Sequence, residues 1–187
     1  MGIGGIIGIV LGALVLILIF WFIGSYNGFI KLRNRVEEAF STMDVYLKKR
    51  YDLIPNLVET VKGYATHERE TLEKVIAARN MAANATNMQE RIEGENMLTG
   101  TLKSLFALAE AYPQLQANVN FMDLQGKLSM LEDEIASSRK YYNALVRDYN
   151  IKREAFPSNI IAGIYRFEKK QLFEIAEPQR ENVKVQF

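Results

Sequence analysis

The chain has 187 residues, which is room for one domain and a membrane anchor. Its formal net charge of +1 excludes a protein built to neutralise nucleic-acid phosphates, because that task requires a large basic surplus. The absence of cysteine excludes disulfides, thiolate metal sites and thiol nucleophiles, and it suits a reducing compartment.

The N-terminal segment is apolar. No charged side chain precedes Lys31, and residues 3–23 are long enough to cross about 30 Å of hydrocarbon as a helix. A cleaved signal peptide would carry a basic start and small residues before the cleavage site, whereas Trp21, Phe22 and Tyr26 stand there. An unbroken apolar run of this length also disfavours a buried core helix. We therefore expect an uncleaved single-pass transmembrane anchor over residues 1–28.

The flanks of the anchor indicate its orientation. Three basic residues follow it and none precedes it, so we expect the N-terminus outside and the rest of the chain in the cytoplasm. Small residues that recur every four positions allow membrane helices to approach closely, and they predict self-association through one face. The basic residues are Lys31, Arg33 and Arg35, and the small residues are Gly4, Gly8 and Gly12.

From residue 29 the apolar side chains follow a heptad, which predicts a long helix that buries one stripe. Pro55 removes a backbone donor, but the apolar phase continues through it, so we expect a kink rather than an end. Gly63 and the residues after it are expected to end the helix. One column comprises Phe29, Val36, Met43, Arg50, Leu57 and Tyr64, and the other comprises Arg33, Phe40, Leu47, Ile54 and Val61.

Further helical patterns follow. One contains Leu72 and Val75, another runs from about residue 98 to 112, a long one extends from Pro113 to Ala155, and a short one covers residues 159–167 with Ser158 as its N-cap. No segment alternates with a period of two. The predicted fold class is all-α: a transmembrane helix, then an elongated antiparallel helical bundle with two long helices over residues 29–175, and a flexible polar tail over residues 176–187.

Four blocks resemble the LemA family. They are VYLKKRYDLIPNLVETVKGYATHE, ALAEAYPQLQANVNFMDLQ, SRKYYNALVRDYN and FPSNIIAGIYRFEKK, in the order in which the family carries them. With the N-terminal helix the resemblance covers essentially the whole chain. It implies a single-pass protein of the bacterial plasma (inner) membrane with a cytoplasmic helical bundle and no established biochemical activity. Some members of that family are tied to magnetosome membrane formation, and others accompany membrane-bound metalloproteases.

Candidate chemistry is sparse. The only histidine is His67, and position 71 is Thr, so the second ligand that a helical zinc motif requires is missing. Glu132, Asp133 and Glu134 point in different directions on a helix and are expected on a solvated face. We expect no catalytic residues, no metal site, no cofactor and no small-molecule substrate.

Arg50 stands in a column that is otherwise apolar. A buried guanidinium requires a carboxylate or hydrogen-bond partners, which predicts an ion pair that sets the register of the bundle. The alternatives are a cytoplasmic docking surface or exposure of Arg50 by a bend at Pro55. Tyr142 and Tyr149 stand in the apolar column of the long C-terminal helix, where packing with a partner for each hydroxyl is expected.

The C-terminal segment combines apolar bulk with positive charge. If the long helices are antiparallel, it returns near the bilayer and can lie in the headgroup region. The alternative is that it only caps the membrane-proximal end of the bundle. The residues concerned are Ile160, Ile161, Ile164, Tyr165, Phe167, Lys169 and Lys170.

The functional hypothesis is a membrane-anchored scaffold or adaptor without catalytic activity. We expect it to form a homo-oligomer and to organise membrane proteins or membrane lipid. The alternative is a regulatory partner or substrate adaptor of a membrane-bound metalloprotease.

Overall fold

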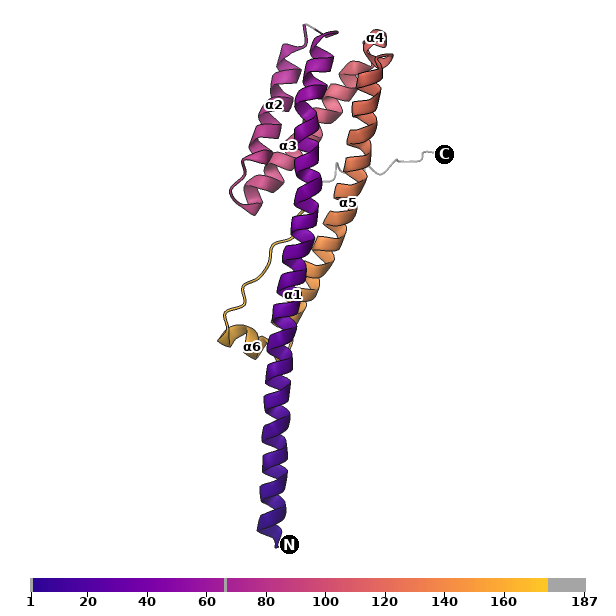
Figure 1. The fold of residues 1–187 in the computed structure, drawn as a ribbon. Helices are drawn as coiled ribbons and strands as arrows, with labels where there is room; N and C mark the ends of the chain where they lie inside the picture. Colours follow the sequence, from indigo (N-terminus) through magenta and orange to yellow (C-terminus); the bar gives the residue numbers. More distant parts are fainter. Residues whose placement is uncertain (1, 66, 175–187) are drawn as a thin grey trace, which may run out of the picture. The chain divides into compact units, whose positions relative to one another are not determined.

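The computed structural model describes residues 2–65 and 67–174, so the predicted tail at residues 176–187 lies outside the described part of the chain. This part contains six helices and no strand, which confirms the all-α fold class. Two helices are much longer than the others, as predicted (Figure 1). The helices are α1 (Ile3–Lys62), α2 (Arg69–Ala83), α3 (Met88–Ala109), α4 (Pro113–Gln116), α5 (Val119–Glu154) and α6 (Ser158–Ile164).

The described residues form two compact units. The first, here the anchor unit, joins residues 2–41 with residues 140–172. The second, here the distal unit, joins residues 42–139 with residues 173–174. Helices α1 and α5 each contribute to both units without a break in the helix.

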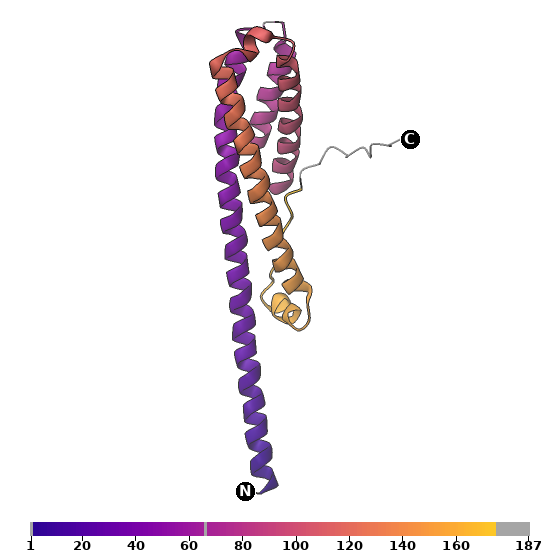
Figure 2. The ribbon, with the colours of Figure 1, turned by 90° about the vertical axis from the view of Figure 1, so that its right-hand side faces the viewer.

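In the anchor unit α1 and α5 run antiparallel. The ring of Phe29 lies 6.1 Å from that of Tyr149, and the ring of Phe40 lies 5.8 Å from that of Tyr142. Residue numbers therefore rise along α1 as they fall along α5. Helix α6 follows the end of α5 and lies beside α1 (Figure 2).

The distal unit packs α2 and α3 with the second part of α1 and the first part of α5 (Figure 1). Asp44 and Tyr51 of α1 contact Arg91 and Glu95 of α3, so these two helices run parallel. Tyr64, just beyond α1, accepts a hydrogen bond from Asn118, just before α5, which fits an antiparallel pair. The fully buried core side chains include Met43, Leu47, Ile54, Leu57, Val61, Val75, Leu98, Leu105 and Leu115.

The predicted stripe of α1 is confirmed by its burial. Phe29, Val36, Met43 and Leu57 are at most 2% exposed, and α1 passes through Pro55 without ending. Tyr64 is 39% exposed, because α1 ends at Lys62 and the helical register is lost beyond it.

Several predicted helix boundaries are wrong. Helix α3 begins at Met88 rather than at about residue 98. The long C-terminal helix does not begin at Pro113, because the four-residue α4 ends first and the carboxamide oxygen of Asn118 then accepts the backbone N–H of Phe121 at the start of α5. Ser158 does not cap α6. Its hydroxyl donates instead to the carbonyl oxygens of Lys152 and Ala155 at the end of α5.

Helix α6 also ends earlier than predicted, at Ile164. Arg166 has a φ of 52°, and its N–H bonds to the carbonyl of Gly163. The N–H of Phe167 bonds to the carbonyl of Ala162 at 2.9 Å. These two bonds form a Schellman motif, which turns the chain back at the helix end with Arg166 in the position that glycine usually takes.

Gly94 sets the close approach of α2 and α3. A Cβ atom on Gly94 would lie 2.6 Å from the Cα and 2.7 Å from the backbone N of Ala82, so a side chain there requires the two helices to move apart. Gly100, further along α3, has open space around the same position.

We expect Gly94→Ala to destabilise the full chain, because overpacking between two helix backbones costs about 1–3 kcal/mol. Gly100→Ala is the matched control and should stabilise the chain by about 0.5–1 kcal/mol through helix propensity alone. Thermal unfolding in detergent, followed by circular dichroism, measures both variants. A Gly94→Ala chain that melts at or above the temperature of the Gly100→Ala chain would contradict the close approach.

Candidate functional site

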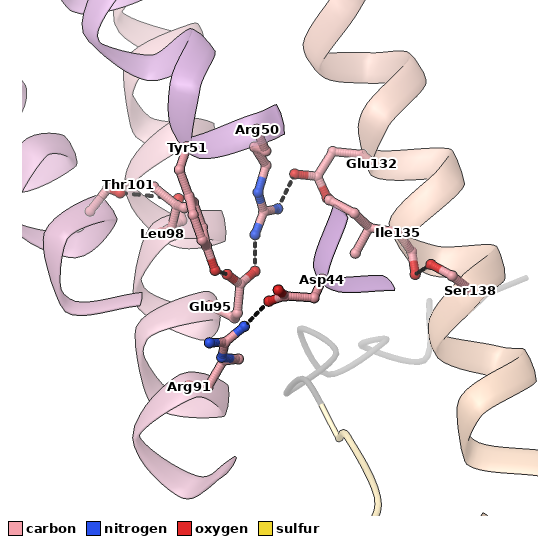
Figure 3. A network of polar contacts seen from close by, with 10 residues as sticks. All are labelled: Asp44, Arg50, Tyr51, Arg91, Glu95, Leu98, Thr101, Glu132, Ile135 and Ser138. Atoms are coloured by element: carbon pink, nitrogen blue, oxygen red, sulfur yellow. Dashed lines mark hydrogen bonds and ion pairs between the residues drawn. The ribbon is translucent and has the colours of Figure 1, made fainter. Parts of the chain in front are cut away.

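The most concentrated charged cluster of the distal unit lies between α1, α3 and α5 (Figure 3). We call it the Arg50 network and define it by Asp44, Arg50, Tyr51, Arg91, Glu95 and Glu132. The Arg50 guanidinium donates to the Glu95 carboxylate through Nη2 and to the Glu132 carboxylate through Nη1. The Tyr51 hydroxyl donates to the other carboxylate oxygen of Glu95.

Burial makes this network costly to disturb. The side chains of Arg50 and Glu95 are both 0% exposed, whereas the Glu132 side chain is 43% exposed. The buried charges of Arg50 and Glu95 cancel, which a low-dielectric interior requires. Among the described residues, the Nε of Arg50 is one of two buried side-chain polar atoms without a hydrogen-bond partner.

The neighbouring groups extend the network along α1 and α3. Burial raises the pKa of Tyr51 more than the positive charge of Arg50 lowers it. The hydroxyl of Tyr51 therefore stays protonated and able to donate. Burial also acts to raise the pKa of Asp44, but hydrogen bonds from Lys48 and Arg91 outweigh it and lower that pKa. Asp44 therefore stays ionised. Its bond to Arg91 links α1 to α3 at a position that precedes the Arg50–Glu95 pair along both helices.

Of this network, only Arg50 was predicted from the sequence to be a buried charge with a partner. Arg50 is buried and paired, an arrangement that suits a register-setting ion pair and leaves no exposed guanidinium for docking. Asp133 and Glu134 are exposed and the Glu132 side chain is partly exposed, as expected, but the ion pair of Glu132 with Arg50 was not predicted. Glu95 was not identified. Its signal was its spacing, three residues from both Ile92 and Leu98 on the buried face of α3.

A second candidate site lies in the anchor unit, where aromatic rings join α6 to α1. The ring of Tyr165 lies 4.6 Å from that of Tyr26 and 6.1 Å from that of Phe22. After the Schellman turn, Phe167 stacks on Phe29 at 4.7 Å with an interplanar angle of 17°. These rings hold α6 beside the part of α1 that directly follows the apolar segment.

The residues after α6 run back along α5, which holds them through its side chains. Arg153 Nε donates to the carbonyl of Phe167, and the Tyr142 hydroxyl donates to the carbonyl of Gln171, each at 2.9 Å. The Asn150 carboxamide pairs with Lys170 in both directions, accepting its N–H and donating to its carbonyl. We call residues 168–172 the strap. A partner for the Tyr142 hydroxyl was expected from the sequence, whereas the bonds that Asn150 and Arg153 make to this segment were not.

The predicted membrane-surface residues divide into two groups. Ile160, Ile164 and Tyr165 are 49%, 60% and 46% exposed, whereas Ile161 and Phe167 are 1% and 8% exposed and pack inside the anchor unit. Ile161 and Phe167 are therefore corrected to core residues. Of the two lysines, Lys169 lies 3.4 Å from Glu154 and Lys170 lies 3.8 Å from Glu37.

The remaining predicted positions are simple to place. Gly4, Gly8 and Gly12 lie on α1 with open space where a Cβ would be, and His67 is exposed in the turn before α2. Within the described ranges no group of three or more His, Cys, Asp or Glu side chains could hold a metal ion. A cavity of about 480 Å³ beside α6 is lined by Arg153, Arg166, Glu154 and Glu168 among others, so its formal charges balance.

We expect Arg50→Ala to lower the stability of the full chain by about 3–5 kcal/mol, because the buried Glu95 carboxylate loses its counter-charge. Arg50→Lys should recover only part of the loss, since an ammonium cannot donate to two carboxylates in the geometry of the guanidinium fork. Arg69→Ala is the control. Its exposed pair with Glu73 should contribute little to stability, because water screens the two charges. Equal melting temperatures for Arg50→Ala and Arg69→Ala would place Arg50 at the surface.

Comparisons with known proteins add to this geometry. The curated relatives include Protein LemA of Metamycoplasma hominis, which is 25% identical over 165 residues that cover 88% of this chain and 75% of the relative. They also include Magnetosome protein MamQ 2 of Paramagnetospirillum magneticum, 25% identical over 175 residues, and Magnetosome protein MamQ of Magnetospirillum gryphiswaldense, 24% identical over 174 residues.

The two MamQ alignments cover 80% and 79% of this chain but 64% of each MamQ protein, which is just under two thirds. Helix α1 contains the one segment in the described part of the chain that is long and apolar enough to cross a membrane. The sequence model of the LemA family matches residues 39–187, which include the Arg50 network, α6 and the strap. The chain therefore belongs to the LemA family.

Proposed function

We propose that this chain is a membrane-anchored scaffold or adaptor that organises membrane proteins or the bilayer and does not catalyse a reaction. The continuity of α1 carries the proposal. One uninterrupted helix begins in a membrane-spanning segment and ends in the packed helices of the distal unit. The chain therefore passes from the apolar segment into the packed helices of the distal unit without a linker segment.

The chemistry of the Arg50 network supports a structural role. Its carboxylates and guanidinium groups bond to one another across three helices, and the Arg50–Glu95 pair is fully buried. Such a pair contributes specificity of packing more than net stability. The names of the relatives, LemA and MamQ, name no enzyme, and the magnetosome proteins among them suggest a role at a membrane.

Self-association is the second part of the proposal. Gly4, Gly8 and Gly12 share one face of α1, and a Cβ at each would meet no atom within 4 Å. Without side chains, this face allows a second copy of the helix to approach closely within the bilayer.

Orientation is the third part. We place the N-terminus outside and the remainder in the cytoplasm of a bacterium, because Lys31, Arg33 and Arg35 follow the span and no basic residue precedes it. A reporter that is active only in the cytoplasm, fused after residue 187, should be active in a bacterial host. A silent cytoplasmic reporter together with an active exported reporter at the same site would reverse the orientation.

Crosslinking of the full chain in intact cells, followed by identification of the attached proteins, tests the function. We expect a homo-oligomer together with other membrane proteins. Gly8→Ile should reduce the homo-oligomer, because a β-branched side chain separates the helices. Ala13→Ile is the matched control, since Ala13 is also small and exposed but lies roughly 140° around the helix from Gly8.

Two other results of the crosslinking experiment would change the proposal. Recovery of one metalloprotease in a constant ratio would favour a protease adaptor instead. A chain that captures neither itself nor another membrane protein would contradict the scaffold.

A further inference from the structure

Helix α6 has two different faces. Its inner side, Ile161 and Ala162, is at most 5% exposed within the anchor unit. Its outer side carries a stripe of large apolar side chains that recur every four residues, beginning just before the helix. Phe156, Ile160 and Ile164 are 80%, 49% and 60% exposed, and Tyr165 beside them is 46% exposed. We call these four residues the α6 stripe.

The position of this stripe along α1 is defined by ring contacts. Tyr165 lies against Phe22 and Tyr26, and the apolar run that can span a membrane ends at Ile23. Aromatic residues at the end of a transmembrane helix mark the membrane–water interface. The anchor unit therefore places α6 at the level where α1 leaves the hydrocarbon.

The charges around α6 suit the same place. Residues 152–170 contain five basic residues (Lys152, Arg153, Arg166, Lys169 and Lys170) and two acidic ones (Glu154 and Glu168). Arg166 and Lys169 are exposed, and Lys152 lies 5.1 Å from the centroid of the Phe29 ring. Long cationic side chains near apolar bulk reach lipid phosphates while their stems stay in the interface.

We propose that α6 lies on the lipid bilayer at the point where α1 emerges, with the α6 stripe inserted at the boundary between headgroups and acyl chains. The inference rests on the proposed membrane anchor. Phospholipid is the occupant, because the stripe adjoins the membrane span and is bordered by cations that suit phosphate groups. The chain then contacts the bilayer twice, once by spanning it and once along its surface.

The buried side of α6 holds the stripe in this orientation. The Schellman turn at Arg166 directs Phe167 onto Phe29, and the strap continues along α5 through Arg153 and Asn150. Because the opposite side is attached to the anchor unit, the stripe faces outward before any lipid is present. Such preorganisation reduces the entropy cost of binding.

Tryptophan fluorescence of the full chain in vesicles of phosphatidylcholine and phosphatidylglycerol tests this. The chain has one tryptophan, Trp21, which reports the span itself. In a Trp21→Phe background, Ile160→Trp and Ile164→Trp place the reporter on the stripe. Tyr141→Trp is the control, because Tyr141 is 54% exposed on α5 and its hydroxyl lies 3.5 Å from Arg35, beyond the end of the span.

Lipids brominated near the headgroup end of the acyl chain quench tryptophan at that depth, and acrylamide quenches tryptophan in water. We expect the brominated lipids to quench the Ile160→Trp and Ile164→Trp variants to an extent comparable with Trp21 in the unaltered chain. The Tyr141→Trp variant should be quenched by acrylamide instead. Circular dichroism confirms that each variant keeps its helix content.

Two outcomes would overturn the inference while Trp21 remains quenched by lipid. If acrylamide quenches the reporters on the stripe as strongly as it quenches the Tyr141→Trp variant, the stripe lies in water. Reporters shielded from both quenchers would show that a protein, either a second copy or another partner, covers it. Loss of lipid quenching at Trp21 itself would instead contradict the membrane anchor, on which the proposed function depends.

Discussion

The guanidinium of Arg50 has to be neutralised where no water can reach it, and this requirement organises the distal unit. Glu95 on α3 and Glu132 on α5 supply the carboxylates, so three helices have to meet at one level. Apolar packing alone tolerates small slips between helices, but a buried ion pair does not, because a slip leaves a charge unpaired. The same level contains Gly94, where the backbone of α3 lies directly against Ala82 of α2. Gly94 therefore sets the separation of α2 and α3, and the next residue, Glu95, sets the register of α3 against α1.

In the anchor unit the side chains of α1 change character along the helix. Through Ile23 the side chains of α1 suit lipid on every side, and from Phe29 onward only one stripe is buried against α5. Aromatic residues lie where the apolar segment ends and the buried stripe begins. The same residues contact α6 and the turn that follows it. The same few rings therefore mark the end of the apolar segment and join α6 to α1.

Much of this arrangement follows from local periodicity. The stripe of α1 through Pro55, the column of α5 through Tyr142 and Tyr149, and the isolated charge at Arg50 all depend on spacing along one helix, which a sequence displays directly. The partners did not follow in the same way. The spacing of Glu95 indicates a buried face, but its partner is defined only when α3 is placed beside α1. Asn150 bonds to backbone atoms that have no sequence signature. Ser158 was predicted to be an N-cap because of its residue type. Its hydroxyl donates instead to a carbonyl oxygen at the end of α5.

The strap is held to α5 through its main-chain atoms. Tyr142, Asn150 and Arg153 contact the carbonyl or amide groups of Phe167, Lys170 and Gln171, which every residue except proline provides in full. These bonds depend on the three side chains of α5 and on main-chain atoms after α6. The path of the strap is therefore fixed by the helix that it follows.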